Sequence, residues 1–115
     1  WEIAFVWAWP VATKAEVEPL ERSIFAHYDA KLPLMNGKAM IAAPGAVPWP
    51  QKQVVQVIEE EERQSRLTPS NRLPRQIKQY DLLVDYILNV KEAPHLKRSL
   101  DAHFERMVRY HQRFL

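Results

Sequence analysis

Cysteine is absent from this chain of 115 residues, and glycine occurs only twice. Without cysteine, the chain has no disulfide, no thiolate metal site and no cysteine nucleophile. Because small secreted domains often depend on disulfides, this absence also favours an intracellular location. The scarcity of glycine disfavours an all-β protein, which would need many tight turns.

The chain also lacks strong charge and a long apolar run. Its formal net charge is +2 and its isoelectric point is near 9.0, far from the charge of a dedicated nucleic-acid clamp. The apolar stretch over residues 1–12 is too short for a transmembrane helix, which needs about 20 residues. The first residue is Trp1 rather than methionine, so we expect that residues upstream were removed or are missing, including any targeting peptide.

Recognisable catalytic and metal-binding motifs are missing as well. Two isolated glycines cannot form a phosphate-binding loop, and neither Gly-x-Ser-x-Gly nor His-Glu-x-x-His occurs. His95, His103 and His111 follow one another at a spacing that advances a helix by about 12 Å, too far for one metal ion. Four consecutive glutamates at residues 59–62 fan around a helix and cannot converge on a cation. We therefore expect no catalytic residue, no cofactor and no metal.

Proline is the residue that the chain has in excess, with nine in total. Each proline disfavours a helix running through it but suits the first position of a new one. Apolar periodicity between the prolines predicts a mostly α protein, in which residues 1–115 form one loosely packed helical domain. Its four helices are expected at residues 19–31, 50–66, 74–91 and 94–113, joined by Pro-rich extended segments.

Two of these helix starts depend on competing signals. Thr13 and Glu16 have the spacing of a capping box, but a helix starting there would meet Pro19 just beyond its first turn. We therefore expect the first helix to start at Pro19. Pro74 is expected to start the third helix in the same way, after a loop.

The third and fourth helices carry the clearest apolar stripes. The third is the most apolar and is the expected core element, with a stripe formed by Ile77, Tyr80, Val84 and Ile87. The stripe of the fourth is formed by Leu96, Leu100, Phe104, Met107, His111 and Phe114. Basic side chains occupy other faces of this helix, including Arg98, Arg106, Arg109 and Arg113. The second helix is mostly charged and is expected to carry the ion pairs Glu59–Arg63 and Glu62–Arg66.

Tryptophan is concentrated outside these helical stripes. Three of the four tryptophans lie in the apolar N-terminal segment, residues 1–12, and the fourth lies between two prolines in a Pro-rich arm, residues 32–50. Three roles are open for the N-terminal segment: it binds a partner, it packs on the chain's own core, or it contacts a membrane interface. Tryptophan suits the first and the third, because it favours a boundary between apolar and wet surroundings. Trp49 docks on the chain itself or on a partner. Asn36-Gly37 would allow a small hairpin within the arm.

Together these features predict a non-catalytic accessory subunit of a large assembly, with other protein subunits as its partners. Because buried tryptophan tends to dominate the energy of an interface, the predicted partner-binding residues are Trp1, Trp7, Trp9 and Trp49. In style, though not in any motif, such a small basic chain is similar to the supernumerary subunits of mitochondrial respiratory complexes and ATP synthase. We therefore expect a mitochondrial location, associated with the inner membrane.

A protein of an organellar ribosome or another ribonucleoprotein particle is the alternative. Extended arms and the basic residues of the last helix fit it, as phosphate contacts combined with aromatic stacking are typical of RNA-binding surfaces. The modest net charge and the glutamate run count against it, because phosphate neutralisation sets the affinity for nucleic acid. A small enzyme is a third candidate, for which no residue pattern suggests a reaction.

Overall fold

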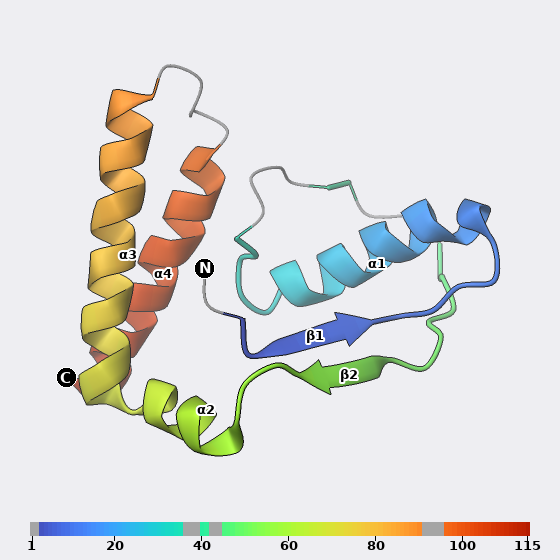
Figure 1. Cartoon of the computed structure of the whole chain (residues 1–115). Helices are drawn as coiled ribbons and strands as arrows, with labels where there is room; N and C mark the ends of the chain where they lie inside the picture. The colour runs from blue at the N-terminus through green and yellow to red at the C-terminus, as the bar shows by residue number, and fades with distance from the viewer. Residues whose placement is uncertain (1–2, 36–39, 42–44, 91–95) are drawn as a thin grey trace.

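Four α-helices and one two-stranded sheet make up the computed structural model, which describes residues 3–35, 40–41, 45–90 and 96–115 (Figure 1). The predicted mostly α fold is confirmed. In chain order the elements are β1 (Phe5–Ala8), the 3-10 turn η1 (Lys14–Glu16), α1 (Val17–Asp29), β2 (Gln53–Gln56), α2 (Glu60–Leu67), α3 (Pro69–Asn89) and α4 (Lys97–Phe114).

The elements form two parts with α2 between them (Figure 1). In the first part, α1 lies along the ribbon made by β1 and β2. In the second part, α3 and α4 run side by side in opposite directions. The molecule is extended for its length: its radius of gyration is 16.6 Å, whereas a compact domain of this size would have about 13 Å.

The prediction of a helix over residues 50–66 is wrong for the first part of this range, which contributes to the ribbon. Gln53–Gln56 instead forms β2, which pairs antiparallel with β1, and the Val57 N–H then donates to the Ala4 carbonyl at 2.8 Å. The paired residues are Phe5 and Gln56, Val6 and Val55, Trp7 and Val54, and Ala8 and Gln53. β-Branched valines favour a strand once a partner strand is available, and that partner lies far away in sequence. The helix begins only at Glu60.

The first helix starts earlier than predicted. α1 begins at Val17, directly after η1, and the capping box is formed, with the Thr13 N–H donating to Glu16 Oε2 at 2.7 Å. Pro19 is accommodated in the first turn because the N–H groups there have no acceptor within the helix. The capping signal therefore decides the start of this helix, not the proline.

The third helix also starts earlier, at Pro69, and runs through Pro74. Pro69 takes the first helical position, which favours proline. Thr68, just before it, donates its hydroxyl to the Ser65 carbonyl at 2.8 Å, so that α2 passes almost directly into α3. The loop expected between the two helices is therefore absent. Pro74 removes one backbone hydrogen bond, which the surrounding helix tolerates.

The connecting segments fall partly outside the described residues. The turn expected at Asn36-Gly37 lies outside them, and so do residues 94–95 at the predicted start of the last helix. In the Pro-rich arm, residues 46–52 form neither helix nor strand. This conformation agrees with the effect of proline, which removes the N–H donor that regular structure needs.

The predicted apolar stripes do not mark the buried faces. The buried residues of α4 are Ser99, Ala102 and His103, whereas Phe104 and Phe114 are exposed. α3, the expected core element, has no fully buried residue in the described chain. α4 contacts α3 on one side and the segment after α1 on the other. The small side chains of Ser99 and Ala102 are buried in these contacts, because they allow the backbones to approach closely.

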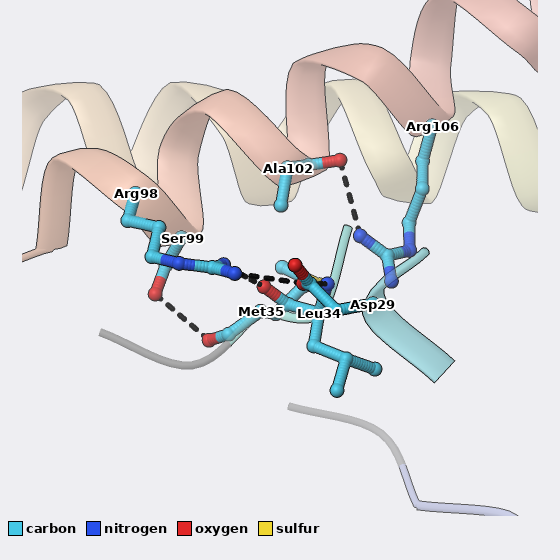
Figure 2. Close-up of polar contacts among 7 residues, drawn as sticks. All are labelled: Asp29, Leu34, Met35, Arg98, Ser99, Ala102 and Arg106. Carbon is cyan, nitrogen blue, oxygen red and sulfur yellow. Dashed lines mark hydrogen bonds and ion pairs between the residues drawn. The ribbon is translucent and has the colours of Figure 1, made fainter. Parts of the chain in front are cut away.

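A polar junction joins α4 to the end of α1 (Figure 2). Arg98 donates to Asp29 Oδ1 and to the Leu34 carbonyl, both at 2.7 Å, and Ser99 Oγ donates to the Met35 carbonyl at 2.8 Å. The Leu34 N–H donates to Asp29 Oδ1 at 2.8 Å, which lowers the pKa of this carboxyl; Arg98 lowers it further. Because both charged side chains are partly buried, these bonds fix the two parts of the molecule to each other.

Glu60 organises the first turn of α2. Its carboxylate accepts hydrogen bonds from three side chains, which are those of Gln56, Arg63 and Gln64. These bonds, that of Arg63 first, lower the pKa of Glu60 from 4.5 to about 2. Arg63 therefore pairs with Glu60 and not with the predicted partner Glu59, whereas the predicted pair of Glu62 and Arg66 is present at 2.7 Å.

Acid should destabilise the fold below about pH 4.5, because the pKa values of Asp29 and Glu60 are lower in the folded chain than their ordinary values of 3.8 and 4.5. Each carboxylate stabilises the fold fully above its unfolded pKa and loses that contribution as the pH falls through its folded pKa. We expect the melting temperature, followed by circular dichroism, to be nearly constant from about pH 7 to 5 and to fall from about pH 4.5 to 2. Asp29→Asn should flatten this fall, and a fall centred near neutral pH would contradict the prediction.

Candidate functional site

Three of the four predicted partner-binding tryptophans lie together beside α1, while Trp1 lies outside the described residues. Trp7 belongs to β1, Trp9 follows it and Trp49 precedes β2, so strand pairing brings the three together (Figure 1). The ring centroids of Trp9 and Trp49 are 6.1 Å apart, and each is 6.3 Å from the ring of Tyr28 in α1. We call Trp7, Trp9, Tyr28 and Trp49 the aromatic cluster.

Trp49 docks on the chain itself. Its indole Nε1 donates to Ser23 Oγ at 2.8 Å, and its ring lies edge-on to the ring of His27 at 5.1 Å. Trp49 and Trp9 are both half-buried. Since a buried indole normally needs a partner for its N–H group, the bond to Ser23 makes Trp49 part of this chain's own packing.

Trp7 is more exposed than Trp9 and Trp49. It is 45% exposed although its ring lies 5.5 Å from the ring of Tyr28. Lys52 places its ammonium group 3.8 Å from the centroid of the Trp7 ring, a cation–π contact. Of the three described tryptophans, Trp7 therefore has the most surface available for another molecule.

The ribbon presents a second apolar surface on the side away from α1. Neighbouring residues of a strand point to opposite faces, and Trp7 contacts α1, so Val6 and its partner Val55 point away from α1. Val57 lies on the same outer face, and all three valines are exposed, Val55 by 60%. In the described chain both outer edges of the ribbon are unpaired. Such edges can accept a further strand from a partner.

An apolar groove with a volume of about 440 Å³ adjoins the aromatic cluster. It lies between α1 and the residues after β1, and its lining includes Trp9, Val11, Leu20, Ile24, Phe25 and Met40. Glu21 is the one charged side chain among the described lining residues. A reaction would need convergent acids, bases or nucleophiles, so this groove is better suited to an apolar side chain of a partner.

A second groove, of about 460 Å³, has the opposite character. It lies where α2, α3 and α4 meet the beginning of β1, and we call it the arginine groove. Five arginines line it, and no carboxylate is among its described lining residues; the arginines are Arg63, Arg66, Arg72, Arg75 and Arg106. No local sequence pattern predicts this site, because the five arginines come from three different helices and meet only in the folded chain.

The other basic residues of the last helix have different roles. Arg98 belongs to the polar junction. Arg109 pairs with Glu105 at 2.6 Å, and the guanidinium carbon of Arg113 lies 5.1 Å from the ring centroid of Phe114. Of the four basic residues noted in this helix, Arg106 alone lines the arginine groove.

Three further findings bear on function. Within the described ranges, no group of three or more His, Cys, Asp or Glu residues is placed to hold a metal ion. None of the described helices combines the length and the apolar character needed to cross a membrane. Comparisons with protein-family models, with curated proteins and with solved structures found no match.

Proposed function

We propose that this chain is a non-catalytic accessory subunit whose exposed apolar surface is covered by other protein subunits of a large assembly. One observation carries this proposal. Among the described residues, the buried apolar core consists of Leu20, Phe25 and Ala102, whereas nineteen large apolar residues are exposed. Single exposed apolar residues are normal, but so small a core beside so many of them is typical of a chain that a partner completes.

The total surface area supports the proposal. The chain exposes 8637 Å², whereas a compact monomer of 13.5 kDa would expose about 6,500 Å². The excess is therefore about 2,000 Å². A standard interface removes about 800 Å² from each partner, so the excess exceeds one such interface and is in the range of obligate contacts.

The surface that best fits a protein partner is the ribbon with its neighbouring apolar groove. It combines the exposed ring of Trp7, the outer valines of β1 and β2, and unpaired strand edges. Aromatic anchors near the centre of an interface carry much of its binding energy, and sheet edges add main-chain hydrogen bonds. Other protein subunits are therefore the proposed partners.

Trp7→Ala should weaken assembly while leaving the fold intact, whereas Trp49→Ala should destabilise the fold. Truncating an aromatic anchor costs about 2 kcal/mol or more of binding, a loss of about 30-fold. The measurement is the fraction of affinity-tagged chain that sediments with a large particle in a native gradient, made from the cells in which the protein occurs. Circular dichroism and thermal unfolding of the purified variants report the effect on the fold.

Leu88→Ala is the matched control, because Leu88 is a 77% exposed apolar residue of α3, outside the ribbon. It should leave the sedimenting fraction unchanged. If Trp7→Ala also leaves it unchanged, or if the wild-type chain sediments as a monomer of high stability, the proposal is wrong. Equal losses in Trp7→Ala and Leu88→Ala would contradict the assignment of the ribbon.

The assembly that we propose is a mitochondrial membrane complex, of the respiratory chain or ATP synthase type. This part of the proposal is supported by the sequence alone, through its weak basicity and tryptophan-rich start. Gradients of detergent-solubilised inner membranes should contain the chain with a respiratory complex or ATP synthase. Co-sedimentation with ribosomal particles would replace this proposal with the ribonucleoprotein alternative.

A further inference from the structure

The arginine groove concentrates positive charge from three helices into one concave site. Arg63 and Arg66 come from α2, Arg72 and Arg75 from α3, and Arg106 from α4. Guanidinium groups present a planar fork of donors that matches the oxygens of phosphate and carboxylate groups. From this arrangement we infer that the groove binds a ligand carrying two or more closely spaced phosphate groups.

The charges of the groove are only partly compensated within the chain. Arg63 and Arg66 pair with Glu60 and Glu62, but neither glutamate is among the described residues that line the groove. No ion pair in the described part of the chain involves Arg72 or Arg106. A ligand with one negative charge would neutralise only one of these two arginines, whereas a di- or triphosphate could neutralise both.

Arg72 and Arg106 are held in place by contacts that leave donors for a ligand. The guanidinium carbon of Arg72 lies 4.0 Å from the ring centroid of Tyr110. Arg106 donates one bond, from Nη1 to the Ala102 carbonyl at 3.1 Å, in the described chain (Figure 2). Guanidinium groups carry five N–H donors, so most of the donors of both side chains are not used by these contacts.

Like-charge repulsion accompanies this arrangement. Burial is the main cause that lowers the pKa of Arg106 below its usual value. The positive charges of Arg109 and Arg72 lower this pKa further, whereas the carboxylates of Glu105 and Asp29 raise it. Burying positive charges near one another is unfavourable unless a counter-charge is present. An anion in the groove would add to the counter-charge that Glu105 and Asp29 supply to Arg106.

Gln76 is an uncharged polar residue in the groove lining. Its side-chain Oε1 is buried in the groove lining and has no hydrogen-bond partner. The Gln76 carbonyl, by contrast, is bonded to His103 Nε2 at 2.7 Å, which holds the backbone in place. The groove volume of about 460 Å³ lies within the usual range for small-molecule sites.

Tripolyphosphate should bind the full-length chain with micromolar affinity in isothermal titration calorimetry at constant ionic strength. Arg72→Gln and Arg106→Gln should each weaken this binding about tenfold or more, because each removes a donor fork and a positive charge. Arg113→Gln, on the same helix as Arg106 but outside the groove, should change the affinity less than about twofold. Without ligand, the groove variants should melt no lower than the wild type, since repulsion is relieved.

Two competitors identify the source of the phosphate groups. A short single-stranded RNA that displaces tripolyphosphate would identify a nucleic-acid backbone as the ligand, whereas a nucleoside triphosphate that displaces it when RNA does not would identify a small phosphorylated molecule. Both outcomes support phosphate recognition. A glutamate-rich peptide of equal charge that binds as tightly as tripolyphosphate would overturn it.

NMR spectroscopy of the wild-type chain provides a second test of tripolyphosphate binding, which needs no substitution. In the wild-type chain, tripolyphosphate should shift the NMR signals of the Nε–H groups of the groove arginines and leave that of Arg22 unchanged. Arg22 is paired with Glu18 in α1, outside the groove. If no groove signal shifts, or if Arg113→Gln weakens binding as much as Arg106→Gln does, the inference is wrong.

Discussion

Replacing Phe25 with alanine should lower the free energy of unfolding by about 3–5 kcal/mol. Phe25 is 6% exposed and is one of three buried apolar residues in the described core. Its ring lines the apolar groove and faces the guanidinium of Arg98, whose carbon lies 5.2 Å from the ring centroid. With so few buried residues, the neighbours have little other apolar packing with which to fill the cavity. Urea denaturation followed by circular dichroism measures the change.

Val17→Ala serves as the control for this prediction, because Val17 belongs to the same helix but is exposed. Exposed substitutions of this kind change the free energy of unfolding by less than about 0.5 kcal/mol. If Phe25→Ala and Val17→Ala have similar small effects, Leu20, Phe25 and Ala102 do not act as the core of this chain. Stability would then have to come from a partner alone.

Arg98→Met should destabilise the chain by about 3 kcal/mol, since each of the two lost hydrogen bonds to a charged group contributes about 1.5–3 kcal/mol, and methionine keeps part of the packing. The substitution removes the bonds to Asp29 and to the Leu34 carbonyl, and leaves a partly buried carboxylate without its cation. The side chains of Arg98 and Asp29 are 24% and 29% exposed, so water can replace only part of what is lost. Thermal and urea unfolding would measure the effect.

A double-mutant cycle with Asp29→Asn isolates the pair itself. We expect a coupling free energy of about 1–2 kcal/mol between Arg98 and Asp29. Arg22→Met is the matched control, because Arg22 forms an exposed pair with Glu18 on α1. Exposed pairs of this kind contribute about 0.3–0.5 kcal/mol. Equal losses in Arg22→Met and Arg98→Met would show that the polar junction does not fix the two parts of the molecule.

The interiors of most helices follow from local sequence, whereas their starts depend on which local signal prevails. Apolar periodicity located the bodies of α1, α3 and α4. Prolines were a poor guide to the starts, since Pro19 and Pro74 both lie inside helices. The start of α1 is set by the capping box at Thr13 rather than by Pro19. The start of α3 is set by Pro69, which takes the first helical position after Thr68, rather than by Pro74.

The sequence by itself thus determined the helical class of this protein, the absence of thiol chemistry and the apolar, aromatic character of its connecting segments. Tertiary structure alone decided that residues 53–56 form a strand, that Trp49 packs on Ser23 and that five arginines meet in one groove. The physical reason is the distance along the sequence over which each kind of interaction acts. Helical periodicity and capping act within a few residues, whereas strand pairing, aromatic docking and a shared groove depend on segments that are distant in sequence and meet only after folding.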